Sequence, residues 1–348
     1  MTAAILISDV LIPFIGTLLL LTPAITRPTV QFGVRVPPER TGAPVLRDQR
    51  RAYYRRAGAV VICCTAAAVA LAGHGSWWLP KIVLLAEVAA ELGCFLRARR
   101  KIVAVKNAER WFAGLRQTVV ADTSWRTDPP RFPVRWLVPA LLVIAATAAV
   151  GAVRATGPRP VIGIVAGQAY VTALWTGLLL LFFRARPEVE ASDPAGSVRR
   201  YRRFLGAFAR AMLTLVALVD LTLLLSGLRA WHVFRPGGIG GDLPAVPFIV
   251  GLLVLAAVTV RAGQGGHRLP VATLGPARAP AAGVDRDDDR FWKGGVIYLN
   301  RDDPALMVGA RVGAGFALNV GNPAAWLIIA VAVAGPAGLT LLLYGLAH

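Results

Sequence analysis

Residues 134–183 read VRWLVPALLVIAATAAVGAVRATGPRPVIGIVAGQAYVTALWTGLLLLFF, which is two long apolar runs joined by a short polar connection. A helix needs about 20 mostly apolar residues to cross the hydrocarbon core of a bilayer, because each residue adds only about 1.5 Å. Each run meets that length. The whole chain has the same character, since 56% of its 348 residues are hydrophobic, 16% are charged and the mean hydropathy is +0.58. The sequence therefore predicts an all-α fold, a polytopic bundle of transmembrane helices.

Eight segments qualify as membrane spans. They are residues 3–22, 57–73, 78–97, 134–153, 161–183, 206–228, 245–261 and 325–346. Four of the regions that separate them, 23–56, 97–135, 184–210 and 261–324, hold 33 of the 38 Lys and Arg residues. Lys and Arg residues near the ends of membrane spans favour the cytoplasmic side of the membrane. We therefore predict a multi-pass protein of the cell membrane, with its long basic loops in the cytoplasm and both termini external.

The same pattern divides the chain into four parts. Residues 1–262 are expected to form a bundle of seven spans, with a cytoplasmic helical extension over 97–130. Residues 263–289, rich in Gly, Pro and Ala, are expected to be a flexible linker, residues 290–323 a small cytoplasmic domain and residues 324–348 the final span. The extension has the pattern of a basic amphipathic helix. Such a helix either contacts a cytoplasmic protein or anionic lipid headgroups, or packs on the protein's own cytoplasmic face.

Composition and motifs argue against several classes of function. A net charge of +19 would indicate nucleic-acid binding in a soluble protein. Here the basic residues flank apolar runs, so the lipid bilayer explains them and no nucleic acid is expected. The three cysteines lie inside apolar runs without the spacing of a metal site or a disulfide framework. No phosphate-binding loop, dinucleotide fingerprint, nucleophile elbow or zinc-protease motif occurs, so we expect no cofactor, no metal and no enzymatic activity.

Four carboxylates lie inside the expected spans: Asp9, Glu87, Glu91 and Asp220. A charged side chain near the bilayer centre costs about 2.5–3.5 kcal/mol, so such a residue usually has a partner or a function. If the helices adjoin, the expected depths form a ladder across the bilayer, and one hypothesis is a proton- or cation-coupled small-solute transporter. The alternative is structural, with each carboxylate protonated or hydrogen-bonded by a neighbouring helix. The candidate donors are Gln168, Thr172, Trp175 and Thr176.

The segment before the last span combines β-prone runs with turn residues. The runs are Val296–Leu299 and Leu306–Val308, and the turns are Asn300–Pro304 and Asn319–Pro323. We expect a small hairpin or meander. A unit of this size is too small to be stable alone, so it should dock on the helices.

Two motifs resemble a known group of membrane proteins. The first is W-K-G-G-x-x-Y-x-N-x-D-D-P followed by G-x-x-x-N-x-G-N-P. It is carried by Trp292, Lys293, Gly294, Gly295, Tyr298, Asn300, Asp302, Asp303, Pro304, Gly315, Asn319, Gly321, Asn322 and Pro323. The second is Phe32-Gly33-Val34-Arg35-Val36-Pro37, directly after the first span. Both are similar to sequences of bacterial, actinobacterial-type multi-pass proteins of the SdpI-like group, where the first forms a C-terminal domain of unknown function.

The resemblance implies a regulatory, signalling or immunity-type role in the cell envelope, with a cytoplasmic protein as a possible partner. The chain departs from the group at one place. The external P-x-H-F/W-x-x-x-G-x-P-D stretch of that group has no counterpart in the connection Arg154–Pro160, which contains neither His nor Asp. The resemblance therefore does not extend to a role that depends on that stretch, such as sensing a toxin.

Overall fold

The computed structural model describes residues 16–72, 78–118, 128–185, 187, 189–191, 193–233, 243–270, 284–313 and 315–345. Within them the helices are Gly16–Ile25, α2 (Pro44–Ala72), α3 (Leu79–Ala108), α5 (Val138–Arg154), α6 (Pro158–Arg184), α7 (Pro194–Ala230), α8 (Ala245–Ala262) and α9 (Pro323–Gly345). Five helices of the described part are long and apolar enough to cross a membrane, by length and composition. The expected helical bundle is confirmed.

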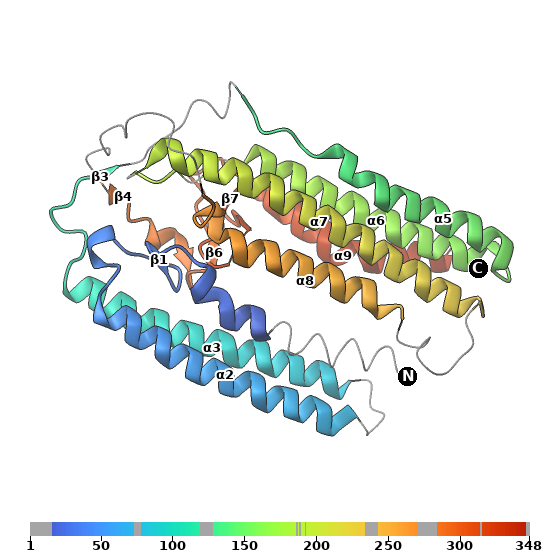
Figure 1. Ribbon diagram of the computed structural model, residues 1–348, viewed down its shortest axis with the longest axis horizontal. Helices are drawn as coiled ribbons and strands as arrows, with labels where there is room; N and C mark the ends of the chain where they lie inside the picture. The colour runs from blue at the N-terminus through green and yellow to red at the C-terminus, as the bar shows by residue number, and fades with distance from the viewer. Residues whose placement is uncertain are drawn as a thin grey trace.

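The helices form two neighbouring groups (Figure 1). In one, α2 and α3 pack side by side as an antiparallel pair. In the other, α7 packs on α5, α6 and α8, while α9 lies against α6. The Tyr170 hydroxyl on α6 donates a hydrogen bond of 2.6 Å to the Val331 carbonyl on α9. The described strands all lie at one end of the helices, which we call the strand end.

Helix α7 is the centre of the larger group, since it packs on α5, α6 and α8. Its sequence is apolar along most of its length, and its first turn is capped. The Asp193 side chain accepts a hydrogen bond of 2.9 Å from the Gly196 N–H, and Pro194 occupies the first turn, where its missing N–H costs nothing. Phe204, Leu205 and Leu213 of α7 are fully buried. This core extends to the strand end, where the aromatic rings of Phe182 (α6) and Phe316 stack with centroids 4.2 Å apart.

Within the described ranges, four two-stranded sheets lie at the strand end. Three are antiparallel: β1 (Val30–Gln31) with β2 (Val34–Arg35), β5 (Trp292–Lys293) with β6 (Ile297–Tyr298), and β7 (Met307–Gly309) with β8 (Phe316–Leu318). The fourth pairs β3 (Gln117–Thr118) in parallel with β4 (Val284–Asp285). A bridge between Tyr298 and Asn319 joins the two C-terminal hairpins. The segment 290–322 is thus two small hairpins in contact.

The expected helical extension over 97–130 is too long, because α3 ends at Ala108. The Arg110 N–H bonds to the Asn107 carbonyl, the Trp111 N–H bonds to the Lys106 carbonyl, and Arg110 has φ 48°. This is the Schellman arrangement, which satisfies the last carbonyls of a helix and reverses the chain. Glycine usually supplies the left-handed residue, so an arginine there carried no visible stop signal. Residues 119–127 of the expected extension lie outside the described residues.

The expected flexible linker over 263–289 is wrong at both described ends. Gln264–Gly266 form a short helical turn, in which the Gln264 side chain accepts a hydrogen bond of 3.0 Å from the Arg27 N–H. At the other end Val284 and Asp285 form strand β4. The aspartates that follow are ion-paired with Lys106 and Arg311, so this end of the segment is fixed. Residues 271–283 lie outside the described residues.

Candidate functional site

The two sequence motifs, more than 250 residues apart, contact each other through glycines at the strand end. The turn between β1 and β2 holds Phe32 and Gly33 at φ 51° and 68°. It lies against Gly295 in the turn between β5 and β6, at φ 79°. A Cβ atom on Gly33 would stand 2.4 Å from the Gly295 carbonyl oxygen. Only glycine allows both this backbone conformation and this close approach.

Arg99 of α3 joins both turns. Its guanidinium donates hydrogen bonds of 2.7 Å to the Gly33 carbonyl and 3.4 Å to the Trp292 carbonyl. Arg311 donates a further hydrogen bond of 3.1 Å to the Gly33 carbonyl, and its guanidinium lies 5.1 Å from the centre of the Trp292 ring. One carbonyl therefore receives two guanidinium groups, an arrangement that suits the planar fork of arginine.

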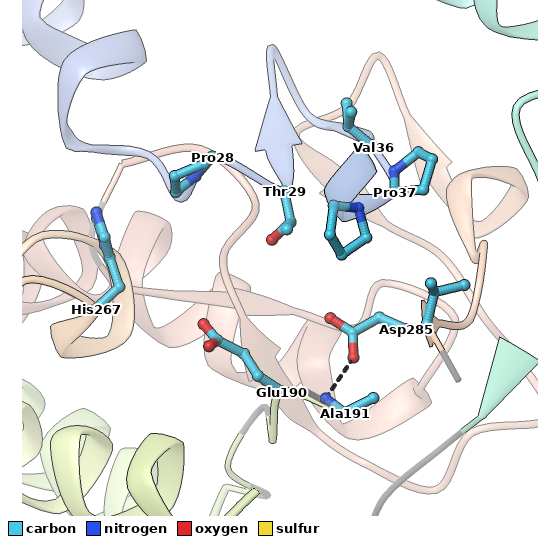
Figure 2. Close-up of a pocket in the computed structure, with 10 residues that line it drawn as sticks. Pro28, Thr29, Val36, Pro37, Glu190, Ala191, His267 and Asp285 are labelled. Carbon is cyan, nitrogen blue, oxygen red and sulfur yellow. Dashed lines mark hydrogen bonds between the residues drawn. The ribbon is translucent and has the colours of Figure 1, made fainter. Parts of the chain in front are cut away.

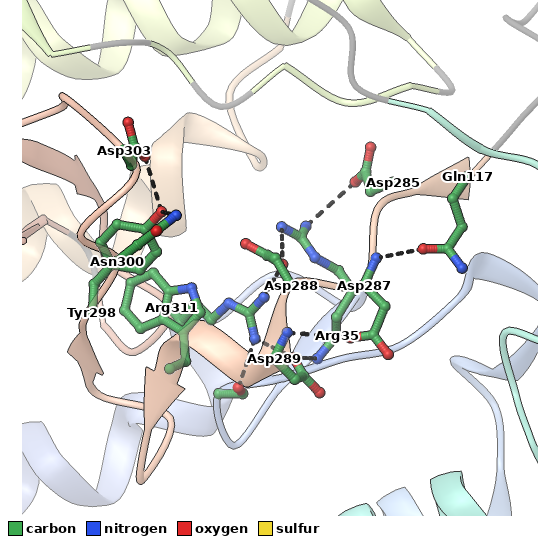
Figure 3. Close-up of polar contacts among 12 residues, drawn as sticks. Arg35, Gln117, Asp285, Asp287, Asp288, Asp289, Tyr298, Asn300, Asp303 and Arg311 are labelled. Atoms are coloured by element: carbon green, nitrogen blue, oxygen red, sulfur yellow. Dashed lines mark hydrogen bonds and ion pairs between the residues drawn. The ribbon is translucent and has the colours of Figure 1, made fainter.

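A network of ion pairs surrounds these turns (Figure 3). Arg311 pairs with Asp288 and Asp289. Lys106, on the last turn of α3, pairs with Asp287 at 2.8 Å and with Asp289 at 2.6 Å. The basic side chains of Lys106 and Arg311 are only 6% and 2% exposed. Breaking a buried pair of this kind by removing one partner costs about 3–5 kcal/mol, because the other charge stays buried and unpaired.

Arg35 of β2 completes the network. Its guanidinium lies 3.4 Å from Asp285 and 3.5 Å from Asp288, and its backbone N–H donates a hydrogen bond of 3.0 Å to Asp289. Burial alone would raise the pKa of Asp289, but the charges of Arg311 and Lys106 and the hydrogen bonds from Lys106 and Arg35 bring the net pKa below its usual value. Asp289 is therefore held as a carboxylate. We call the residues 30–35, 99–112 and 284–322 the motif assembly.

Several polar residues of the first motif hold the backbone of the motif assembly. The Asn319 side chain is fully buried and donates to the carbonyls of Asn300, Asp303 and Ala305, while its oxygen accepts from the N–H groups of Asn300 and Gly321. The Tyr298 hydroxyl donates to Asp303 at 2.9 Å. Asn322 caps the start of α9 by accepting a hydrogen bond of 3.0 Å from the Ala324 N–H, and Pro323 is the first residue of that helix.

Lys293 and Asp302 are the charged motif residues whose side chains are exposed. They lie in β5 and in the turn after Asn300. The other motif residues have roles in the turns and hairpins: Gly294 lies at φ 61°, Gly321 lies against the Asn300 backbone, and the Pro304 carbonyl accepts from Asn322. Lys293 and Asp302 are thus the charged motif side chains that a partner could reach.

A pocket of about 280 Å³ opens beside the motif assembly (Figure 2). It lies between the segment Pro28–Pro38, which includes Pro37 of the second motif, and residues of three later segments. Asp285 and Glu190 line it, but both are engaged: Asp285 accepts a hydrogen bond of 2.9 Å from the Ala191 N–H, and Glu190 lies 3.3 Å from Arg200. Burial, with the nearby arginines, lowers the pKa of His267 to about 4, although its hydrogen bond to the Gln264 carbonyl opposes this shift. No group of three or more metal-ligating side chains occurs in the part of the chain that the structure describes.

The carboxylates of the expected ladder fall into separate helix groups. Glu87 and Glu91 lie on α3, which packs chiefly on α2. Asp220 lies on α7 and is fully buried, with Thr172 donating 2.8 Å to its side chain and Gln168 donating 2.8 Å to its backbone carbonyl. Gln168 also donates to the Thr147 hydroxyl at 2.9 Å. Asp9 lies outside the described residues. Two of the expected donors therefore serve Asp220, and none of the four expected donors bonds Glu87 or Glu91 in the described structure.

Sequence reasoning missed the basic residues of the network, Arg99, Lys106 and Arg311. They come from segments far apart in the chain, and each looks like one more loop or helix arginine or lysine among 38. The one available signal was the run of four aspartates within residues 285–289, the densest negative charge in a strongly basic chain. Comparison adds no assignment, since no family model, curated protein or solved structure matches the chain.

Proposed function

We propose that this chain is a non-enzymatic, multi-pass membrane protein with a regulatory, signalling or immunity-type role in the cell envelope, as the SdpI-like resemblance implies. In this proposal eight helices cross the bilayer and the motif assembly faces the cytoplasm. There it presents a fixed surface to a cytoplasmic protein.

The arrangement of the helix ends supports the orientation. The described parts of the four basic regions all lie at the strand end, because successive helices run in alternate directions (Figure 1). Positive charge gathered at one end of a helical bundle favours the cytoplasmic side for that end. The opposite end has only short described connections, such as that between α5 and α6.

The observation that carries the regulatory proposal is the buried ion-pair network of the motif assembly. It fixes two distant segments of the chain, 30–35 and 284–322, to the end of α3. Its charges pair with one another within the protein. Buried networks of this kind specify one arrangement of the backbone when every member is satisfied. The exposed side chains of Lys293 and Asp302 then lie at fixed positions on the strand end, where a protein partner could contact them.

The experiment compares cross-linking in native membranes for three full-length tagged proteins. These are the wild type, Arg311→Met, which breaks the network, and Arg301→Met, a matched change at an exposed arginine of the same segment. We expect a cytoplasmic protein to cross-link in stoichiometric amount to the wild type and to Arg301→Met, and to be lost from Arg311→Met. Size-exclusion chromatography checks that Arg311→Met keeps the helical bundle. Equal cross-linking to all three, or to none, would rule the proposal out.

A second candidate is a proton- or cation-coupled transporter of small solutes. It is supported by the complete burial of Glu87, Glu91 and Asp220 within the helices. The division of these carboxylates between α3 and α7 counts against one continuous ladder. Flux into liposomes tests it: wild-type flux of protons or cations that is abolished by Glu87→Gln with Asp220→Asn would favour transport over regulation.

A further inference from the structure

We propose that Glu87 and Glu91 together form a proton-binding site in the seam where helix Gly16–Ile25 meets α2 and α3. The two side chains stand one helical turn apart on the buried face of α3 and are 0% and 1% exposed. This proposal does not depend on the regulatory function proposed above, and it requires no passage of protons across the bilayer.

The seam is built closely around the carboxyl groups. Gly16 lies opposite Glu87, and a Cβ atom at Gly16 would stand 2.4 Å from the Glu87 Oε1 atom and 2.9 Å from Val61 of α2. The Tyr53 hydroxyl of α2 donates a hydrogen bond of 2.8 Å to the Leu19 carbonyl and so ties the same helix to α2. Glycine at position 16 therefore leaves the space that the Glu87 carboxyl group occupies.

Neither carboxyl group has a hydrogen-bond donor within the described structure. All four carboxyl oxygens are buried and unpartnered. Asp220 shows the contrast, since Thr172 donates to its carboxylate. An ionised carboxylate without donors is very costly in an apolar interior, and two of them one turn apart repel each other. The geometry therefore suits two neutral, protonated groups.

A proton fits this site better than a metal ion. Calcium and magnesium ions require six or more oxygen ligands, and a group of three or more ligating side chains is missing from the described ranges. The backbone carbonyls of the surrounding helices are largely occupied by helical hydrogen bonds.

Few other charges reach the site. The titratable groups that interact with it are Tyr53 and Cys64 from α2, and Cys94 of α3 lies beside Tyr53. The described helix Gly16–Ile25 contains no titratable residue. Among the described residues, no lysine or arginine donates a hydrogen bond to either carboxyl group. Loss of the protons would place two repelling charges in the seam and separate Gly16 from α3.

The test is modification by dicyclohexylcarbodiimide, an apolar reagent that reacts with protonated carboxyl groups and adds its own mass to them. The purified full-length protein in lipid is treated from mildly acidic to mildly alkaline pH, and the modified residue is located by peptide mass spectrometry. We expect modification at Glu87 or Glu91 that decreases as the pH rises. Excess Na⁺, Mg²⁺ or Ca²⁺ should not protect the site.

Variants separate the site from its surroundings. In Glu87→Gln with Glu91→Gln the modification should be lost, whereas Asp220→Asn, a matched change at a hydrogen-bonded carboxylate, should leave it unchanged. The wild-type pH profile stands even if the double variant fails to fold. Absence of modification at both residues at acidic pH overturns the proposal, and protection by a metal ion overturns it in favour of a cation site. Modification without any flux in liposomes would separate proton binding from transport.

Discussion

At the scale of single residues, the contact between the two sequence motifs depends on Gly33. Its φ is positive, and an added Cβ atom would stand only 2.4 Å from Gly295, so there is no room for a methyl group. We expect Gly33→Ala to lower the free energy of unfolding by more than about 1 kcal/mol, since the left-handed conformation alone costs an alanine about that much. Thermal unfolding of the purified protein measures the change. Gly42→Ala is the control, because nothing lies within 4 Å of its added Cβ, and an equal loss there would contradict the argument.

His267 makes the stability of the strand end depend on pH. Its pKa falls to about 4 in the folded protein against 6.5 for the free side chain, mainly because of burial. Between these pKa values the imidazole binds a proton in the unfolded chain but not in the folded chain. The contribution of His267 to the free energy of unfolding is therefore complete above about pH 6.5 and is lost as the pH falls towards 4.

We therefore expect the unfolding midpoint of the wild type to fall more steeply over this range than that of His267→Gln. The exposed His232 gives the matched control, His232→Gln. Carboxylates such as Asp289 titrate in all three proteins, so the difference between the slopes isolates His267. Parallel slopes for the wild type and His267→Gln would show that burial of this imidazole has no effect.

At the scale of elements, the helices were predictable and their ends were not. The apolar runs of α5, α6 and α8 predict helices of the observed kind, because an apolar run of about 20 residues is typical of a membrane-spanning helix. The end of α3 depends instead on Arg110 in a left-handed conformation and on Trp111 folding back to Lys106. Both features depend on tertiary contacts and cannot be recognised in the sequence. The residue pattern continued in a helical period past Ala108, so sequence periodicity extended the helix too far.

Lys106, in the last turn of α3, links the end of this helix to the C-terminal segment. It is the last buried residue on the inner face of α3, and it pairs with Asp287 and Asp289 from a segment about 180 residues away. We expect Lys106→Met to destabilise the protein by about 3–5 kcal/mol, because two carboxylates lose their buried partner. Hydrogen exchange should also rise selectively in residues 284–293.

Lys101→Met serves as the control on the same helix, since Lys101 is exposed. A change there should alter stability by no more than about 0.5 kcal/mol. If both substitutions gave the same small effect, the ion pairs of Lys106 would contribute nothing to the stability of the strand end.

At the scale of the whole molecule, the residues of the two sequence motifs meet at the strand end and have structural roles there. Asn319, Asn322 and Gly33 are recognisable because turns and caps need those residue types at fixed spacings. The ion-pair network that joins them was not predictable, since it links basic residues that resemble many others in the chain to aspartates in a segment expected to be a flexible linker. Likewise, the sequence placed Glu87, Glu91 and Asp220 within helices, but it did not indicate which helices adjoin. That is why an expected single ladder became two separate sites.

The orientation of the bundle gives the last prediction. The strand end carries the positive charge and the motif assembly, so in whole cells an impermeant maleimide should not reach it. Single cysteines are placed in a protein lacking Cys63, Cys64 and Cys94: Glu39→Cys and Asp302→Cys at the strand end, and Thr156→Cys in the turn between α5 and α6, all at exposed positions. Thr156→Cys should label in intact cells, and the other two only after permeabilisation. The reverse pattern would turn the motif assembly outward and remove the cytoplasmic partner, while leaving the buried pair on α3 untouched.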